Sequence, residues 1–274
     1  MDANWSLDDI PWERFDPTKV DPEILRTVRA ACLVEHHSDD YAAYLCSVFH
    51  DDPEFQDEAR TWAAEEVQHG RALRRWAELA DPAFDFEDRF ARYAAGHVIQ
   101  LEASQSVRGS RARELIARCI VEVGTSSFYS AVRDATEEPL LKHLCHRIAG
   151  DEYRHYSLFY RHLKRYRTVE GPSPWQGLMT ALGRFAESSD DEITYAYFCG
   201  NGETGPYRRR WHSIACTSRS LRHYKREHVR RGIAMGLKAA GFRPRSRIGL
   251  ALTGLGWWLF RAHAWRVARM AAAA

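Results

Sequence analysis

Two Glu-x-x-His motifs carry the clearest chemical signal in this sequence: Glu66 with His69 in "EEVQH", and Glu152 with His155 in "DEYRH". Residues three apart on a helix share one face, so each pair can hold the same ion. About one such motif is expected by chance in a chain with 13 His and this Glu content. The repetition therefore matters more than either copy.

A single Glu precedes each motif at nearly the same distance, Glu35 by 31 residues and Glu122 by 30 residues. Both stand in apolar helical stripes, where a carboxylate is costly unless it is paired or binds a metal. Two helices giving one Glu each and two giving Glu-x-x-His form the ligand pattern of dimetal carboxylate bundles. Four carboxylates and two imidazoles suit iron, or manganese, better than zinc. The predicted metal ligands are Glu35, Glu66, His69, Glu122, Glu152 and His155.

Three neighbouring residues have positions from which they can assist such a site. Glu65 and Asp151 directly precede the two motif glutamates, and each can accept a hydrogen bond from the distal nitrogen of the opposite half's His. The alternative for both is an ordinary exposed carboxylate. Thr125 stands one turn after Glu122, where its hydroxyl can steer protons near the metals. Its alternative is a hydrogen bond to its own helix backbone.

Helical periodicity dominates the chain, and alternating strand patterns are nearly absent, which predicts an all-α protein. Long helices joined by short connections predict an antiparallel bundle. The stretch "CGNGETGP", residues 199–206, is rich in turn residues. The expected helices cover residues 22–49, 53–79, 87–100, 110–135, 138–166, 175–187 and 207–240, with a last one from residue 246.

The charge distribution divides the chain into two parts. From Arg208 onward sixteen Lys and Arg stand against one Glu, a net charge of +15, whereas residues 1–207 carry 23 basic and 36 acidic residues, a net charge of −13. We expect a metal-binding bundle over residues 1–170 and a basic helical region over residues 171–274, used for docking or packing. Such segregation indicates a polyanionic partner: an acidic protein, an anionic membrane surface or a nucleic acid.

Cellular location is constrained by two features. The six Cys have no paired spacing, and the acidic first residues lack the apolar run of a secretion signal, so a cytoplasmic protein is expected. The apolar stretch "IGLALTGLGWWLF" is too short to span a bilayer. With the nearby arginines it suits either a helix lying in a membrane interface or a packing or dimer-forming helix.

These motifs resemble the ferritin-like di-iron proteins, and among them the soluble acyl-acyl-carrier-protein desaturases, over roughly residues 20–166. "RTWAAEEVQHGRALRRW" and "IAGDEYRHYSLFY" are similar to that family's two Glu-x-x-His helices. The resemblance implies a ferritin-like four-helix bundle in which the six ligands bind two iron ions. It also implies a role for Thr125 in oxygen chemistry, and it makes Trp62 and Asp151 candidates for supporting the ligands or relaying electrons.

The resemblance further implies an oxidoreductase that uses dioxygen and a ferredoxin-like electron donor to desaturate or hydroxylate a fatty acyl chain. The basic region would then dock an acyl carrier protein or an anionic membrane, and a homodimer is expected. Two alternatives remain: a di-iron monooxygenase acting on an amine or a modified tRNA nucleotide, and a ferritin-like protein that handles iron or peroxide.

Overall fold

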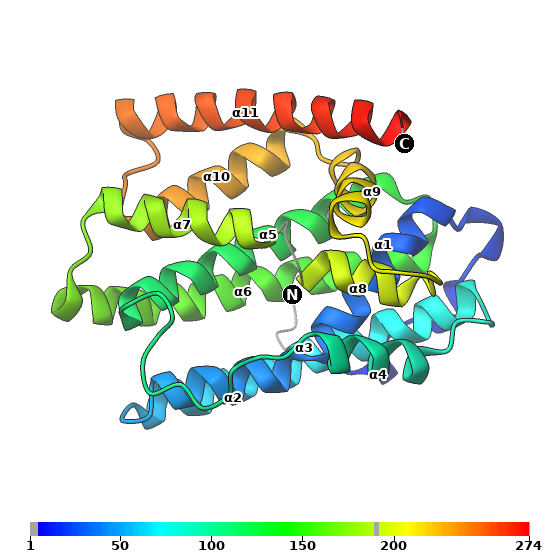
Figure 1. The fold of residues 1–274 in the computed structure, drawn as a ribbon, viewed down its shortest axis with the longest axis horizontal. Coiled ribbons are helices and arrows are strands. Elements are labelled where there is room, and N and C mark those ends of the chain that lie inside the picture. The colour runs from blue at the N-terminus through cyan, green and yellow to red at the C-terminus, as the bar shows by residue number, and fades with distance from the viewer. Residues whose placement is uncertain (1–4, 189–191, 274) are drawn as a thin grey trace.

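A computed structural model describes residues 5–188 and 192–273 (Figure 1). In these residues the regular structure is entirely helical, so the all-α prediction is confirmed there. None of the helices in the described part of the chain is both long and apolar enough to cross a membrane.

The first long hairpin consists of α1 (Pro22–His36), α2 (Ser38–Val48) and α3 (Pro53–Ala80). Asp21 caps α1 by accepting hydrogen bonds from the backbone N–H groups of Glu23 and Ile24. The prediction of one helix over 22–49 is wrong, because the chain leaves helical geometry at His37 (φ −92°, ψ 11°). The buried His37 ring lies 2.9 Å from Asp40, and the following "SDD" suits a new helix start better than a helix interior.

The second long hairpin consists of α5 (Arg111–Ala135) and α6 (Pro139–Glu170), which pack along each other. Glu138 caps α6 by accepting hydrogen bonds from the N–H groups of Leu140 and Leu141. The same carboxylate accepts a 2.7 Å hydrogen bond from Nε1 of Trp76 on α3. The start of α6 is thereby fixed against α3, and the two hairpins are held together at this end.

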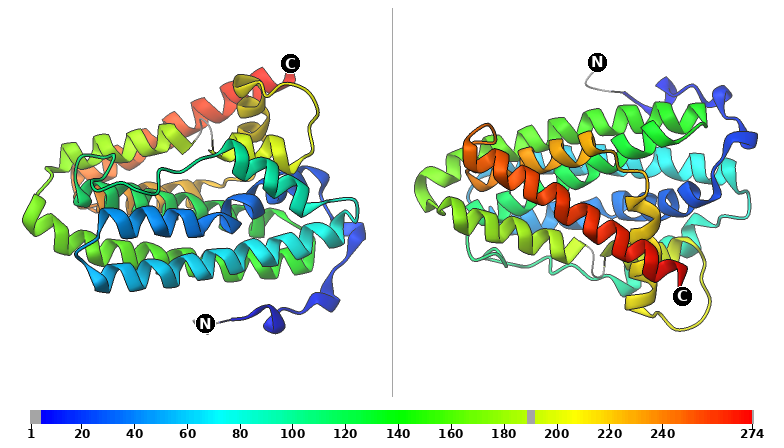
Figure 2. Two further views of the ribbon diagram at one scale, coloured as in Figure 1. Left: turned by 60° about the horizontal axis from the view of Figure 1, so that its bottom comes forward. Right: turned by 90° about the horizontal axis from the view of Figure 1, so that it is seen from above.

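Six further α-helices of the described residues surround these hairpins. The α7 and α10 helices pack on α5, α8 packs on α1 and α4, and α11 packs on α9 and α10 (Figures 1 and 2). Their bounds are α4 Phe86–Gly96, α7 Pro174–Ser188, α8 Glu192–Gly200, α9 Arg209–Leu221, α10 Arg226–Ala240 and α11 Arg247–Ala272.

Three sequence predictions for this region need correction. The helix α8 was not predicted, because its residues from Ala196 to Gly200 are all buried and give no amphipathic period. The expected helix over 207–240 is instead α9 and α10, since Nδ1 of His228 accepts the backbone N–H of Lys225 and starts a new helix there. The helix α4 ends four residues before the predicted residue 100.

Candidate metal centre

The candidate ligands lie between two separate hydrophobic clusters. On α6, one cluster ends at Ala149 and the other begins at Tyr156. The first hairpin shows the same interruption on α3, between Ala63 and Ala72. Glu152, His155, Glu66 and His69 occupy these intervals, and Glu35 and Glu122 occupy the equivalent intervals of α1–α2 and α5. The polar site is therefore enclosed by apolar side chains above and below, and the six candidate ligands are at most about 5% exposed.

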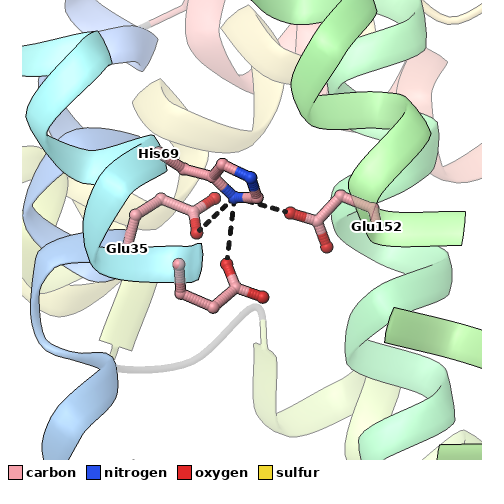
Figure 3. A group of neighbouring side chains, drawn as sticks. Glu35, His69 and Glu152 are labelled. Atoms are coloured by element: carbon pink, nitrogen blue, oxygen red, sulfur yellow. Dashed lines mark ion pairs between the residues drawn. The ribbon is translucent and has the colours of Figure 1, made fainter. Parts of the chain in front are cut away.

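His69 is the centre of one group of ligand atoms (Figure 3). Its Nδ1 faces three carboxylates, at 4.0 Å from Glu35, 3.4 Å from Glu66 and 3.6 Å from Glu152. These side chains come from α1, α3 and α6, so three helices converge on one point. One oxygen or nitrogen of each of the four residues lies within 4.8 Å of the others, a spacing that can hold a metal ion.

His155 is the centre of a second group with the same composition. Its Nδ1 lies 2.9 Å from Glu66, 3.7 Å from Glu122 and 4.0 Å from Glu152. Glu66 and Glu152 belong to both groups, whereas Glu35 and Glu122 each belong to one. The arrangement is thus two adjacent positions that share two carboxylates and have one histidine each. All six residues predicted from the sequence are brought together.

The distal nitrogens of both histidines are held by carboxylates. Nε2 of His69 bonds to Asp151 at 3.0 Å, and Nε2 of His155 bonds to Glu65 at 2.8 Å. Each carboxylate comes from the opposite hairpin, as the sequence suggested. Because Nε2 carries the proton in each bond, the Nδ1 lone pair points toward the glutamates, where a metal would need it. Arg154 pairs with both Asp151 and Glu65 and joins the two arrangements.

The donor atoms at the centre are buried and unsatisfied in the described part of the chain. With both rings neutral and protonated at Nε2, the atoms that make no hydrogen bond are Nδ1 of His69, Nδ1 of His155, both carboxylate oxygens of Glu122 and Oε1 of Glu152. Leaving buried polar atoms unpaired costs about 1–3 kcal/mol each. Five such atoms directed at two adjacent positions fit two bound cations, which would pair all of them.

The pKa shifts in the metal-free state reflect crowded charge. Burial raises the pKa of Glu35 well above its usual value, and repulsion from Glu66 adds to this. Burial and repulsion from Glu66, Glu35 and Glu122 do the same to the pKa of Glu152. Burial opposes protonation of His155, but the charge of Glu66 prevails and its pKa rises well above its usual value. The crowded negative charge that makes these groups retain protons in the absence of metal would also attract metal cations.

Thr125 adjoins this centre. Its hydroxyl donates a hydrogen bond to Glu152, and its contacts to the backbone oxygens of Val121 and Glu122 are longer, at 3.3 Å. Both readings of this residue from the sequence therefore have a counterpart in the structure. The hydroxyl is in direct contact with one of the two shared carboxylates.

Trp62 and Asp151 contact different histidines of the site. The Trp62 ring packs edge-on against His155 and Phe159, and its buried Nε1 has no hydrogen-bond partner among the described residues. Asp151 instead accepts a 2.7 Å hydrogen bond from Nε1 of Trp5, whose ring stacks on His69. The tryptophan that contacts the Asp151–His69 pair is therefore contributed by the N-terminal segment.

Besides Trp5, two other residues make contacts at the site that the sequence did not predict. Tyr129 donates a hydrogen bond to Glu35, and Arg154 pairs with Asp151 and Glu65. Tyr129 stands on the same helical stripe as Glu122, two turns further on, so its position was a usable signal. The contact of Trp5 had no sequence signal, because 146 residues separate it from Asp151.

Comparison with known proteins does not identify the function of this chain. The chain matches no protein-family model and no curated protein sequence. The function is accordingly inferred from the ligand atoms, their burial and the residues that hold them.

Proposed function

We propose that α1–α2, α3, α5 and α6 form a ferritin-like antiparallel four-helix bundle that binds two metal ions. With these ions the protein would act as a dioxygen-dependent oxidoreductase. The observation that carries this proposal is the pair of overlapping ligand groups, which share Glu66 and Glu152. One ion would be held by Glu35 and His69, the other by Glu122 and His155, with the shared carboxylates between them. This donor set favours iron, with manganese as the alternative.

Two iron ions in such a site supply dioxygen activation and removal of hydrogen from an unactivated C–H bond. The chain contributes the surroundings in which this chemistry is controlled. The two hydrophobic clusters exclude water from the centre. The hydroxyl of Thr125 holds a proton at Glu152. Asp151 connects His69 to Trp5 by hydrogen bonds, which is a short path for an electron from an external donor.

We propose a fatty acyl chain as the substrate, to be desaturated or hydroxylated. A hollow of about 360 Å³ between α2 and α3 is lined in part by Ala42, Ala43, Cys46 and Ala63, which are small and largely apolar. Ala63 lies one turn before Glu66, so one lining residue of this hollow and one candidate ligand belong to the same stretch of α3. Asp39 and Arg60 also line the hollow, and Arg60 supplies the positive charge that an anionic head group would need. This combination suits a narrow apolar chain with a charged end.

The proposal is tested by loading the protein with iron(II) without oxygen and then admitting air. Free fatty acids and acyl-carrier thioesters are offered together with a ferredoxin-type donor, and products are measured by mass spectrometry. Loss of two hydrogens or gain of one oxygen is expected, and Glu152→Ala should abolish it. Oxidation of many iron ions per chain, or rapid peroxide consumption without acyl product, would instead establish an iron- or peroxide-handling protein.

A further inference from the structure

The helix α11 lies on the outside of the molecule, across α9 and α10 (Figures 1 and 2). Only a narrow stripe faces inward, with Gly249, Thr253 and Val267 buried. Gly249 allows the start of α11 to approach the preceding turn, since a Cβ there would lie 2.3 Å from the carbonyl oxygen of Arg243. One face of α11 is thus seated on the protein, and most of its circumference remains open.

The open side of α11 carries large apolar side chains, interspersed with Arg247, Arg266 and Arg269, where a surface helix is normally polar throughout. Six large apolar side chains of α11 are between 55% and 66% exposed, and five of them, all but Leu250, form one row. Their spacing of 7, 3, 1 and 6 residues places them on one side of the helix, away from the buried stripe. They are Ile248, Leu255, Trp258, Leu259 and Trp265.

The same helix has only positive charges. Between Arg247 and Ala272 there are four Arg and no Asp or Glu. Arg261 lies over the rings of Trp257 and Trp258, at 5.9 and 5.7 Å from their centroids, and Arg269 lies 5.1 Å from that of Trp265. Adjacent Trp and Arg side chains suit the boundary between acyl chains and anionic head groups.

A second apolar stripe lies on α7, a helix that packs against α10 as α11 does. Trp175, Met179, Leu182 and Phe185 are spaced by four, three and three residues and are all more than half exposed. The two helices that carry these stripes therefore pack against the same helix. Together they expose more apolar side chain than the isolated exposed residues usual on a protein surface.

We propose that α11 binds the surface of an anionic lipid bilayer, with its axis along the membrane plane and its Trp and Leu side chains inserted between head groups. Charge selects this occupant. The region from Arg208 onward carries +15, which attracts anionic lipid and repels the same surface of a second copy. An acidic carrier protein would satisfy the arginines but would leave the row of Leu and Trp side chains largely unpaired. The proposal does not depend on the redox chemistry.

The test is flotation of the full-length protein with phosphatidylcholine vesicles, with and without phosphatidylglycerol. Binding is expected only with phosphatidylglycerol and should weaken as salt is added. Two variant sets separate the contributions. W258S/L259S/W265S removes apolar side chains at constant charge, and R261Q/R266Q/R269Q removes three charges. The second set should weaken binding about a hundredfold, at about fivefold for each charge near an anionic surface.

The matched control is V98S/V107S, which removes exposed apolar side chains far from α11 in sequence and should bind as the parent does. All substituted positions in α11 are exposed, and unchanged helicity will verify the fold. Loss of binding in both α11 variants supports the proposal. It is overturned if the parent fails to bind anionic vesicles at low salt, or if W258S/L259S/W265S binds normally.

Three other outcomes also overturn it. A dimer that W258S/L259S/W265S converts to monomer would make this face a contact between copies. Binding to acyl carrier protein, or to RNA, that requires the arginines but not Trp258 and Trp265 would assign the face to those partners. Because none of these measurements involves iron or turnover, their failure is distinguishable from failure of the proposed oxidoreductase.

Discussion

His155 and His162 lie two turns apart on α6, and both bond through Nε2 to a glutamate of α3 at 2.8 Å, Glu65 and Glu58 respectively. Both rings are buried. They differ at the other nitrogen. Nδ1 of His155 faces Glu66, Glu122 and Glu152, whereas Nδ1 of His162 is 2.9 Å from the guanidinium of Arg165. Both histidines thus make the same contact between α6 and α3, but Nδ1 faces a carboxylate cluster in one and a cation in the other.

This difference makes His162 a matched control for the metal site. His155→Ala should reduce bound iron or manganese below two ions per chain, because one of the two positions loses its nitrogen donor. His162→Ala should retain two ions, although both substitutions remove a buried imidazole from the same helix. Metal content after dialysis, measured by elemental analysis, decides the outcome. Equal retention by the two variants would contradict the assignment.

Asp151 and Glu65 should act on metal affinity through the histidines they hold. Replacing Asp151 or Glu65 by Ala removes the hydrogen bond to Nε2 and frees the ring to rotate. Metal affinity is expected to fall about 10–100-fold in each variant. Titration with manganese, followed by electron paramagnetic resonance, measures this loss. Glu58→Ala, which frees His162 instead, should leave the affinity unchanged.

Thr125 should affect turnover and not metal binding. Its hydroxyl donates to Glu152, so Thr125→Val removes a proton donor while preserving side-chain shape. The rate of acyl oxidation is expected to fall about a hundredfold, within the range typical of a positioned proton donor. Thr125→Ser retains the hydroxyl and should restore most of the rate. A Val variant as fast as the parent would show that the hydroxyl only bonds its helix.

The metal-free protein should become less stable as pH rises from about 5 to about 8. The folded-state pKa values of Glu35, Glu152, His69 and His155 are raised, so folding retains protons on these groups. That contribution is full below the unfolded pKa values, about 4.3 for Glu and 6.5 for His, and is lost as pH rises through the folded ones. Glu66, whose pKa is depressed, acts only below this window.

Thermal unfolding measures this dependence. Because metal binding requires the ligands to release their protons, manganese should raise the melting temperature more at about pH 8 than at about pH 5. The double variant Glu35→Gln/Glu152→Gln should show a flatter pH profile without metal. If the melting temperature of the parent protein does not change with pH, or rises with it, the conclusion that folding retains protons on these four groups is wrong.

Ala43 tests the hollow beside α2 and α3. Ala43→Trp should fill it and raise KM for long acyl substrates severalfold, with little change in metal content. The control is Ala91→Trp, which places the same ring at an exposed alanine of α4. Unchanged KM in the Ala43 variant would exclude the hollow as the substrate path.

The sequence by itself predicted which of the candidate residues share a helix face, because helical periodicity is a local property. A spacing of three residues puts Glu66 beside His69 in any helix, and the same holds for Glu152 and His155. The burial of Glu35 and Glu122 followed equally from their apolar stripes. Long helices and their starts were also predictable, since Asp21 and Pro22 act within the first turn.

Contacts between distant segments were decided only by the tertiary structure. Glu66 and Glu152 belong to both ligand groups because of the distances between helices. No local sequence pattern specifies these distances. The hydrogen bond from Trp5 to Asp151 was likewise not predictable from local sequence. Nor was the helix break at His37, where the packing of the His37 ring on Tyr93 outweighs continued helical periodicity. Sequence periodicity also marked the last segment as apolar and basic. Only the packing of α11 on α9 and α10 showed that Trp258 and Trp265 face outward, because a helix buries whichever face its neighbours cover.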